Sequence, residues 1–145
     1  MTRPPPVQRI LVIRLSAIGD VIMASAVIPA LRRAYPEARI DWLVEPAARE
    51  ILAANPRLDD LLVWPKGQWK ADLRRGRLLR VAREAGGLVR RLRSARYDLV
   101  LDLQGLLKSA LWARLTGAPR RIGVGSREGG QHLMTRVVSR RRDDP

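Results

Sequence analysis

The stretch ILVIRLSAIGDVIMASAVIPALRRAYPEARIDWLV, residues 10–44, decides the fold. It begins with an apolar run over residues 10–15 that predicts a buried strand, and it ends with a second such run over residues 40–44. Between them, residues 21–35 have the length and apolar content of a helix. Because parallel strands need a long crossover connection, this succession of strand, helix and strand predicts the beginning of a parallel sheet.

The same alternation continues along the chain. The further predicted elements are a helix over residues 47–54, a strand over 61–64, a basic amphipathic helix over 73–95, a strand over 98–103, a helix over 106–115 and a strand over 121–124. Pro29 predicts a kink in the first helix, and Gly86-Gly87 weakens the basic one. We therefore predict an α/β fold over residues 10–138: a Rossmann-like, doubly wound, mostly parallel sheet with helices on both faces.

Length and composition favour one soluble domain. The chain has 145 residues, 46% of them hydrophobic, and no apolar run as long as a membrane span. Residues 1–9, MTRPPPVQR, are rich in proline, so we expect them to be flexible and not to act as a secretory signal. The chain has no cysteine, which excludes disulfides, and we expect a cytoplasmic protein. With His132 as the one histidine, a Cys/His zinc site and a Cys- or His-dependent triad are disfavoured.

Charge is the unusual feature of the composition. The formal net charge is +14, and all but three of the 28 basic residues are arginine. Arginine forks bind phosphate and carboxylate groups bidentately, so a phosphorylated ligand, an anionic membrane and nucleic acid are all admissible partners. The same arginines also fit a biased genome composition, with most charges on solvated helix faces. Residues 139–145 are expected to form a basic tail.

Three residues after the first predicted strand are candidates for a ligand site. In a parallel sheet, ligands bind beyond the carboxyl ends of the strands, and Ser16, Gly19 and Asp20 follow the first strand there. Gly19 would let the backbone turn tightly and leave room for a ligand, and Asp20 either caps the following helix or acts on the ligand. Only one glycine stands where a dinucleotide-binding fingerprint requires three, and a P-loop is absent.

Four longer segments carry a family resemblance. They are RLSAIGDVIMASAVIPALRRAYPEARIDWLVEP, NPRLDDLLVWP, YDLVLDLQGLLKSALWARLTGAPRRIG and GSREG. In this order and spacing they closely resemble the N-terminal half of the ADP-heptose:lipopolysaccharide heptosyltransferase family, above all its heptosyltransferase I branch, over residues 9–138. The resemblance implies an inverting glycosyltransferase of GT-B architecture, in which two Rossmann-like domains face each other across a cleft. It also implies that the N-terminal domain, here residues 10–138, receives the acceptor and that a C-terminal domain holds the nucleotide sugar.

By this resemblance, the reaction is the transfer of heptose from ADP-heptose to a Kdo sugar of a lipid A precursor, at the cytoplasmic face of the inner membrane. Asp20 aligns with the acid proposed as general base, which an inverting displacement requires on the acceptor side. A helix N-terminus favours the ionised carboxylate, which keeps such a base deprotonated but weak. The resemblance implies no metal and no cofactor besides the donor substrate.

The resemblance also implies a set of acceptor-binding residues, namely Ser16, Gly19, Lys70, Gln104, Lys108 and Arg127. Kdo carries a carboxylate and lipid A carries phosphates, so fixed cations such as Lys108 and Arg127 have an evident task. A lone lysine near a helix start is otherwise commonly just solvated. The segment KGQWK, residues 66–70, departs from the family pattern, which is richer in arginine, and only its last residue is cationic at a matching place. Arg74 or Arg75 are the candidates to compensate.

Two tryptophans and the basic helix are further candidates. Trp64 ends an apolar strand and is predicted to belong to the core. Trp69 lies in the polar segment 66–70, predicted as a loop, and is a candidate for insertion at a membrane interface or for stacking on a sugar. The basic helix, over residues 74–96, either lies near anionic lipid headgroups or presents a solvated face.

The resemblance ends before a second Rossmann-like domain. We therefore expect the nucleotide-sugar domain to be absent from this chain, and the chain alone not to transfer heptose. The competing hypothesis is a non-catalytic basic module that binds anionic lipid or, less readily, nucleic acid. Nucleic acid is disfavoured because no known nucleic-acid module, aromatic platform or glycine-rich strand-binding motif accompanies the charge.

Overall fold

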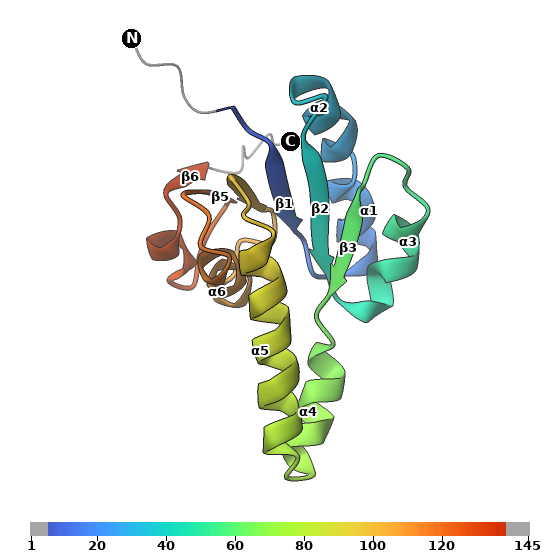
Figure 1. Ribbon diagram of the computed structural model, residues 1–145, viewed down its shortest axis with the longest axis vertical. Coiled ribbons are helices and arrows are strands. Elements are labelled where there is room, and N and C mark those ends of the chain that lie inside the picture. The colour runs from blue at the N-terminus through green and yellow to red at the C-terminus, as the bar shows by residue number, and fades with distance from the viewer. Residues whose placement is uncertain (1–5, 139–145) are drawn as a thin grey trace, which may run out of the picture.

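The computed structural model describes residues 6–138, which form a six-stranded parallel sheet between two layers of helices (Figure 1). The strands are β1 Arg9–Ile13, β2 Arg39–Val44, β3 Asp60–Val63, β4 Leu99–Asp102, β5 Arg120–Val124 and β6 Arg136–Val138. Their order in the sheet is β3-β2-β1-β4-β5-β6, and every neighbouring pair is parallel. The predicted Rossmann-like, doubly wound α/β fold is therefore confirmed. The predicted basic tail, and most of the predicted flexible start, lie outside the described residues.

Helices connect the strands on both faces of the sheet. They are α1 Ile18–Ala24, α2 Val27–Ala34, α3 Arg49–Ala53, α4 Lys66–Arg74, α5 Leu78–Ser94 and α6 Leu107–Leu115, with two 3₁₀ turns, η1 Pro46–Ala48 and η2 Gly130–Leu133. The chain proceeds from β1 outward to β3 and then returns to β4 on the other side of β1. The strand order therefore reverses between β1 and β4, and the carboxyl ends of strands at such a reversal are where ligands of this fold class bind.

β1 is the centre of the core, because its side chains alternate between two apolar clusters. Ile10 and Val12 face α1, α2 and α3, whereas Leu11 and Ile13 face α5 and α6, and all four are fully buried. Full burial of one such side chain contributes about 1.5–3 kcal/mol. A sheet covered on both faces explains why its strands are continuous apolar runs in the sequence.

The first predicted helix is two helices in the structure. α1 ends at Ala24 and α2 begins at Val27, so the break lies between these residues. There the hydroxyl of Ser25 donates to the carbonyl of Ile22, a local bond that competes with continuation of the helix. Pro29 is the third residue of α2, and having no N–H it cannot bond to the carbonyl of Ser25, four residues earlier, where the break lies. The predicted interruption of the helix is therefore present, as a break four residues before Pro29 rather than a kink at the proline itself.

The predicted basic helix over residues 73–95 is also divided. α4 already begins at Lys66, within the segment predicted as a loop, and α5 begins at Leu78. The turn between them contains Gly76, whose φ of +74° is readily adopted by glycine and rarely by other residues. Gly86-Gly87 lies inside α5 and does not interrupt it.

Both tryptophans of this region pack against the core. Trp69 is 9% exposed, its ring centroid lies 6.3 Å from that of Trp112, and its Nε1–H donates to Glu84 at 2.8 Å. The prediction that Trp69 contacts a membrane or a sugar was therefore wrong, because α4 turns its ring inward. Trp64 packs edge-on against Trp112 at 5.4 Å, in agreement with its predicted place in the core.

The short strand β6 was missed from the sequence. Its three residues are all exposed where it pairs with β5 at the edge of the sheet. A strand exposed in this way lacks the apolar run that marks a buried strand, so nothing in its sequence distinguished it from a loop.

Candidate functional site

The candidate site lies at the carboxyl edge of the sheet, where the loops after β1, β2 and β4 are joined by hydrogen bonds. The Glu45 N–H donates to the Leu15 carbonyl at 3.0 Å. The side-chain Oε1 of Gln104 accepts from the N–H groups of Leu15 at 3.1 Å and Ser16 at 3.4 Å. These bonds fix the loop that precedes Asp20 beside the loop that carries Gln104.

The loop after β4 also packs closely against the loop after β5. Gly105 has a φ of +74°, and a Cβ atom there would lie 2.9 Å from the carbonyl oxygens of Val124 and Gly125. The Arg127 N–H donates to the Gly105 carbonyl at 2.9 Å. Glycine alone permits this approach without a clash, so the backbone of the GSREG segment is fixed beside that of the DLQG segment.

Asp102 is the buried centre of this edge. One carboxylate oxygen accepts from the N–H groups of Gln104 at 3.0 Å and Gly105 at 3.1 Å, and the other accepts from the Ser109 hydroxyl at 3.0 Å. Burial raises the pKa of Asp102 above its ordinary value, against the opposing effect of these hydrogen bonds. Because its carboxylate accepts hydrogen bonds from the following loop and from Ser109 of α6, Asp102 positions that loop and the start of α6.

Asp20 is held by a buried arginine. The Arg14 guanidinium lies 3.0 Å from the Asp20 carboxylate and donates to the Leu103 carbonyl at 2.7 Å. Arg14 is 8% exposed, whereas the side chain of Asp20 is 55% exposed. The buried cation thus presents the carboxylate to solvent in a fixed orientation, at a pocket of about 320 Å³ that Met23 and Val124 also line.

The structure bears on the capping role that was predicted for Asp20. Asp20 is the third residue of α1, and the helix has no side-chain capping bond at its N-terminus, so the capping role is not realised. The predicted tight turn at Gly19 was also wrong, because Gly19 lies inside α1 and has no positive φ. A Cβ atom added at Gly19 would meet nothing within 4 Å, so the position does leave open space next to Asp20.

The three lysines of the chain meet at the same edge. Lys66 begins α4, Lys70 follows one turn later, and Lys108 lies in the first turn of α6. The pKa of Lys108 is below its ordinary value, first because the neighbouring amino group of Lys66 disfavours its protonated form, then because Lys108 is partly buried, and further because the charge of Lys70 repels its own. Glu45 opposes this shift, and within residues 6–138 one of its carboxylate oxygens is buried without a hydrogen-bond partner. An anion bound among these lysines would relieve their repulsion.

Most of the predicted acceptor residues are thus gathered at one edge. Ser16 and Gln104 are joined by a hydrogen bond, and Lys70 and Lys108 belong to the lysine cluster. Arg127 is exposed in the loop after β5, which its backbone ties to the loop after β4. No three His, Asp or Glu side chains of residues 6–138 are grouped so as to hold a metal ion. The role of these residues toward an acceptor stays a prediction.

Sequence reasoning missed four residues of this edge: Arg14, Glu45, Lys66 and Asp102. Arg14 and Asp102 had a readable signal, because each is a charged residue inside an apolar run that predicts a buried strand. Glu45 and Lys66 had no such signal, since their approach to Lys108 depends on how the loop after β2 and the start of α4 lie beside α6.

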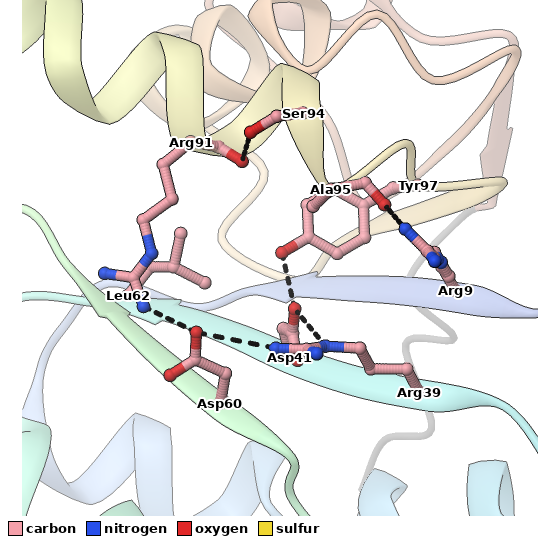
Figure 2. A pocket seen from close by; sticks show the side chains of 9 residues that line it. All are labelled: Arg9, Arg39, Asp41, Asp60, Leu62, Arg91, Ser94, Ala95 and Tyr97. Atoms are coloured by element: carbon pink, nitrogen blue, oxygen red, sulfur yellow. Dashed lines mark hydrogen bonds and ion pairs between the residues drawn. The ribbon is translucent and has the colours of Figure 1, made fainter.

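A second polar pocket lies at the opposite, amino end of the sheet, between α5 and strands β2 and β3 (Figure 2). Asp41 is 1% exposed, accepts a hydrogen bond from the Tyr97 hydroxyl at 2.6 Å and pairs with Arg39 at 3.1 Å. Asp60 pairs with Arg39 at 3.7 Å and with Arg91, which reaches it from α5. Burial raises the pKa of Asp41 above its ordinary value. Both carboxylates of this pocket are paired with arginine, so we interpret it as a structural ion network that ties α5 to the sheet.

Comparison with known proteins gives the chain its relatives. Residues 86–145 match the model of Glycosyltransferase family 9 (heptosyltransferase). Lipopolysaccharide heptosyltransferase 1 of Pseudomonas aeruginosa is 33% identical over 137 residues, a match that covers 91% of this chain and 36% of that protein. The chain spans about a third of the length of these curated relatives.

Solved structures agree with these relatives. The structure of E. coli ADP-heptose lps heptosyltransferase II is 28% identical with a TM-score of 0.68, and the match covers 90% of this chain and 34% of that one. E. coli heptosyltransferase WaaC with ADP is 22% identical with a TM-score of 0.81, and the match covers 95% of this chain and 43% of that one. At this lower identity, the second likeness shows a common fold.

Proposed function

The chain is homologous to the heptosyltransferases of glycosyltransferase family 9, and from this premise we propose that it is the acceptor-binding half of such an enzyme. The whole enzyme would transfer heptose from ADP-heptose to a Kdo sugar of a lipid A precursor, with inversion, in the cytoplasm at the inner face of the inner membrane. The observation that carries the proposal is the exposed Asp20 carboxylate, which the buried Arg14 holds at the carboxyl edge of the sheet.

Asp20 is suited to be the general base. Its carboxylate would accept the proton of the acceptor hydroxyl while the hydroxyl oxygen forms its bond to the anomeric carbon of heptose. The bond from that carbon to ADP breaks at the same time, and its electron pair leaves with the ADP phosphate oxygen. Arg14 contributes by fixing the carboxylate, because a base displaced by an ångström loses much of its effect.

The lysine cluster is suited to hold the anionic groups of the acceptor. A carboxylate of Kdo or a phosphate of lipid A would accept charge-assisted hydrogen bonds from Lys66, Lys70 and Lys108. Binding would also remove the repulsion that lowers the pKa of Lys108, so the site gains more from an anion than a single exposed lysine would. Arg127, exposed in the neighbouring loop, would extend this recognition.

We propose that ADP-heptose is held by residues outside this chain. The described residues form one sheet, and the chain spans about a third of its relatives. Transfer needs the anomeric carbon of the donor close to the acceptor hydroxyl, and such proximity supplies about 7–11 kcal/mol of the barrier. The chain alone is therefore expected to fold and to bind the acceptor without transferring heptose.

The test joins the chain to the whole part of the Pseudomonas aeruginosa relative that follows the matched segment and measures ADP release, with the intact relative as positive control. Release that requires both ADP-heptose and a Kdo-bearing acceptor supports the proposal. The chain alone should show a cooperative thermal transition and release no ADP; acceptor-dependent release by the chain alone would contradict the assignment of the donor site. Acceptor binding by a folded joined protein that never releases ADP would favour the competing function, a non-catalytic module for anionic lipid.

A further inference from the structure

The hairpin formed by α4 and α5 projects from the body of the domain (Figure 1). α4 leaves the carboxyl end of β3, and α5 returns toward the amino end of β4. The nine residues of α4 reach about 13 Å. The end of the hairpin, residues 73–80, which we call the tip, therefore stands beyond the carboxyl edge of the sheet.

The tip is an ordered turn. The Arg77 N–H donates to the Asp72 carbonyl at 2.9 Å, and the Arg77 guanidinium lies 3.6 Å from the fully buried Asp72 carboxylate. Gln68 donates to the same carboxylate at 3.1 Å, and the hydrogen bond from Trp69 to Glu84 ties the two helices together. The side chains of the tip are thus presented by a fixed backbone.

Three leucines of the tip are exposed to solvent. The exposed fraction is 46% for Leu73, 61% for Leu78 and 83% for Leu79. The hairpin leucines nearer the sheet, Leu88 and Leu92, pack against the core instead. None of the helices in residues 6–138 is both long and apolar enough to span a membrane. Apolar side chains gathered at the end of a rigid protrusion indicate a surface that contacts a partner.

The tip also contains four exposed arginines, namely Arg74, Arg75, Arg77 and Arg80. Two are balanced within the hairpin, because Arg77 pairs with Asp72 and Arg80 with Glu84. Arg74 and Arg75 have no carboxylate within 4 Å among the described residues, so the tip carries positive charge together with exposed apolar side chains. Its partner must therefore offer anionic groups with apolar material directly beneath them, as an anionic bilayer does and a nucleic acid does not.

We propose that the tip inserts into the surface of an anionic phospholipid bilayer. Its leucines enter the boundary between headgroups and acyl chains, and its arginines bind the lipid phosphates. The C-terminal part of α5 packs against the domain, since Arg91 pairs with Asp60 and Leu92 is buried. The membrane contact is therefore confined to the tip and does not extend along the whole basic helix. This inference deepens the membrane location given in the proposed function, and vesicle binding tests it separately from heptose transfer.

The first experiment measures cosedimentation of the full chain with phosphatidylcholine vesicles that contain or lack phosphatidylglycerol. We expect binding only to the anionic vesicles, and weaker binding at high salt. The double change Arg74→Gln with Arg75→Gln should lower the partition coefficient about 30-fold, and Leu78→Ser with Leu79→Ser at least about tenfold. Matched controls are Leu111→Ser, an exposed leucine of α6, and Arg33→Gln, an exposed arginine of α2, and both should bind as the unchanged chain does.

A second experiment reads insertion directly. Because the chain has no cysteine, Leu79→Cys provides a unique site for an environment-sensitive fluorophore. Its emission should shift to the blue on anionic vesicles, and the same label at Leu111→Cys should not shift. This measurement stays decisive even where a multiple substitution impairs folding, since Leu79 is 83% exposed.

Three results would overturn the proposal. The first is vesicle binding that leucine changes leave intact together with an unshifted label at Leu79→Cys. The second is a dimer, detected by ultracentrifugation, that Leu78→Ser with Leu79→Ser converts to a monomer while vesicle binding persists, which would assign the tip to a second copy. The third is failure to bind anionic vesicles combined with binding to duplex DNA that the arginine changes abolish.

Discussion

The two ends of the sheet use charged residues in opposite ways. At the amino end, Asp41 and Asp60 are each paired with arginine, and Tyr97 donates a further hydrogen bond to Asp41. At the carboxyl end, Lys66 and Lys108 are brought together with Lys70, and the nearby Glu45 is the one acid that opposes their repulsion.

This difference separates structure from function. A network in which each charge is paired is complete without a ligand, and its loss costs stability. Like charges held close together repel one another and lower the stability of the folded state while no anion is bound among them. A bound anion removes this repulsion. We therefore expect changes at the amino end to alter unfolding, and changes at the carboxyl end to alter binding and turnover.

The largest effect is expected at Asp20. In the chain joined to a donor half, Asp20→Asn should lower turnover by about 10²–10⁴-fold and leave acceptor affinity nearly unchanged, because the substitution keeps the shape and removes the base. Steady-state ADP release measures the first effect, and titration with a Kdo-bearing acceptor the second. Asp59→Asn is the matched control, since Asp59 is also an exposed acid paired with an arginine, Arg32. Turnover that stays near normal in Asp20→Asn would show that Asp20 is not the base.

The cations of the carboxyl edge come next. Lys108→Ala and Arg127→Ala should each weaken acceptor binding by about 1–3 kcal/mol if they pair with acceptor anions, and should not lower the melting temperature. Calorimetric titration and thermal denaturation provide the two measurements. Arg33→Ala, at an exposed position on α2, should change neither. A lowered melting temperature with unchanged affinity would make these residues structural.

The opposite pattern is expected at the amino end. Tyr97→Phe removes the hydroxyl that donates to the buried Asp41, and should lower the free energy of unfolding by about 1–3 kcal/mol without changing acceptor affinity. Tyr35→Phe is the control, because no hydrogen bond of the Tyr35 hydroxyl is made among the described residues. Urea denaturation measures the effect. A Tyr97→Phe protein of unchanged stability but weakened acceptor binding would reverse the roles given to the two ends.

The smallest expected effect is on the pH dependence of stability. Burial raises the pKa of Asp102, so the folded state binds its proton more tightly than the unfolded chain does. The contribution of this protonated carboxyl to the free energy of unfolding is fully present below the ordinary pKa of about 4. It is lost as the pH rises through the pKa of Asp102 in the folded state. The stability of Asp102→Asn relative to the unchanged chain should therefore increase as the pH rises from acid to neutral. Urea denaturation at a series of pH values checks the sign, with the exposed Glu50→Gln as control; the opposite sign would mean that the hydrogen bonds to Asp102 outweigh its burial.

The sheet was predictable because its inner strands are buried on both faces. Ile10 and Leu11 face different clusters and are both apolar, so β1 is a continuous run that needs no tertiary information to recognise. The helix boundaries were less predictable. Pro29 indicated an interruption of the first helix, but its place at Ser25 also depends on a local bond of that residue. The turn at Gly76 depends on α5 packing back against the sheet, which is not visible in an apolar pattern.

The site was predictable only in part. Asp20 and Lys108 were chosen as candidates through the family resemblance and their places after strands. The ion pair between Asp20 and Arg14 could not be predicted in this way, because the turn between β1 and α1 brings the two side chains together. Trp69 was wrongly predicted to lie at the surface, because it stands in a basic segment of the sequence. In the structure α4 directs its ring into the core.

The most direct test of these roles is a titration of the chain with a soluble Kdo-bearing acceptor, followed by amide NMR spectra. If the carboxyl edge binds the acceptor, the amide signals of Ser16, Gly105 and Lys108 shift with a common dissociation constant, and those of Arg39 and Tyr97 at the amino end stay in place. Shifts confined to Arg39 and Tyr97, with Ser16, Gly105 and Lys108 unchanged at saturating acceptor, would contradict the account.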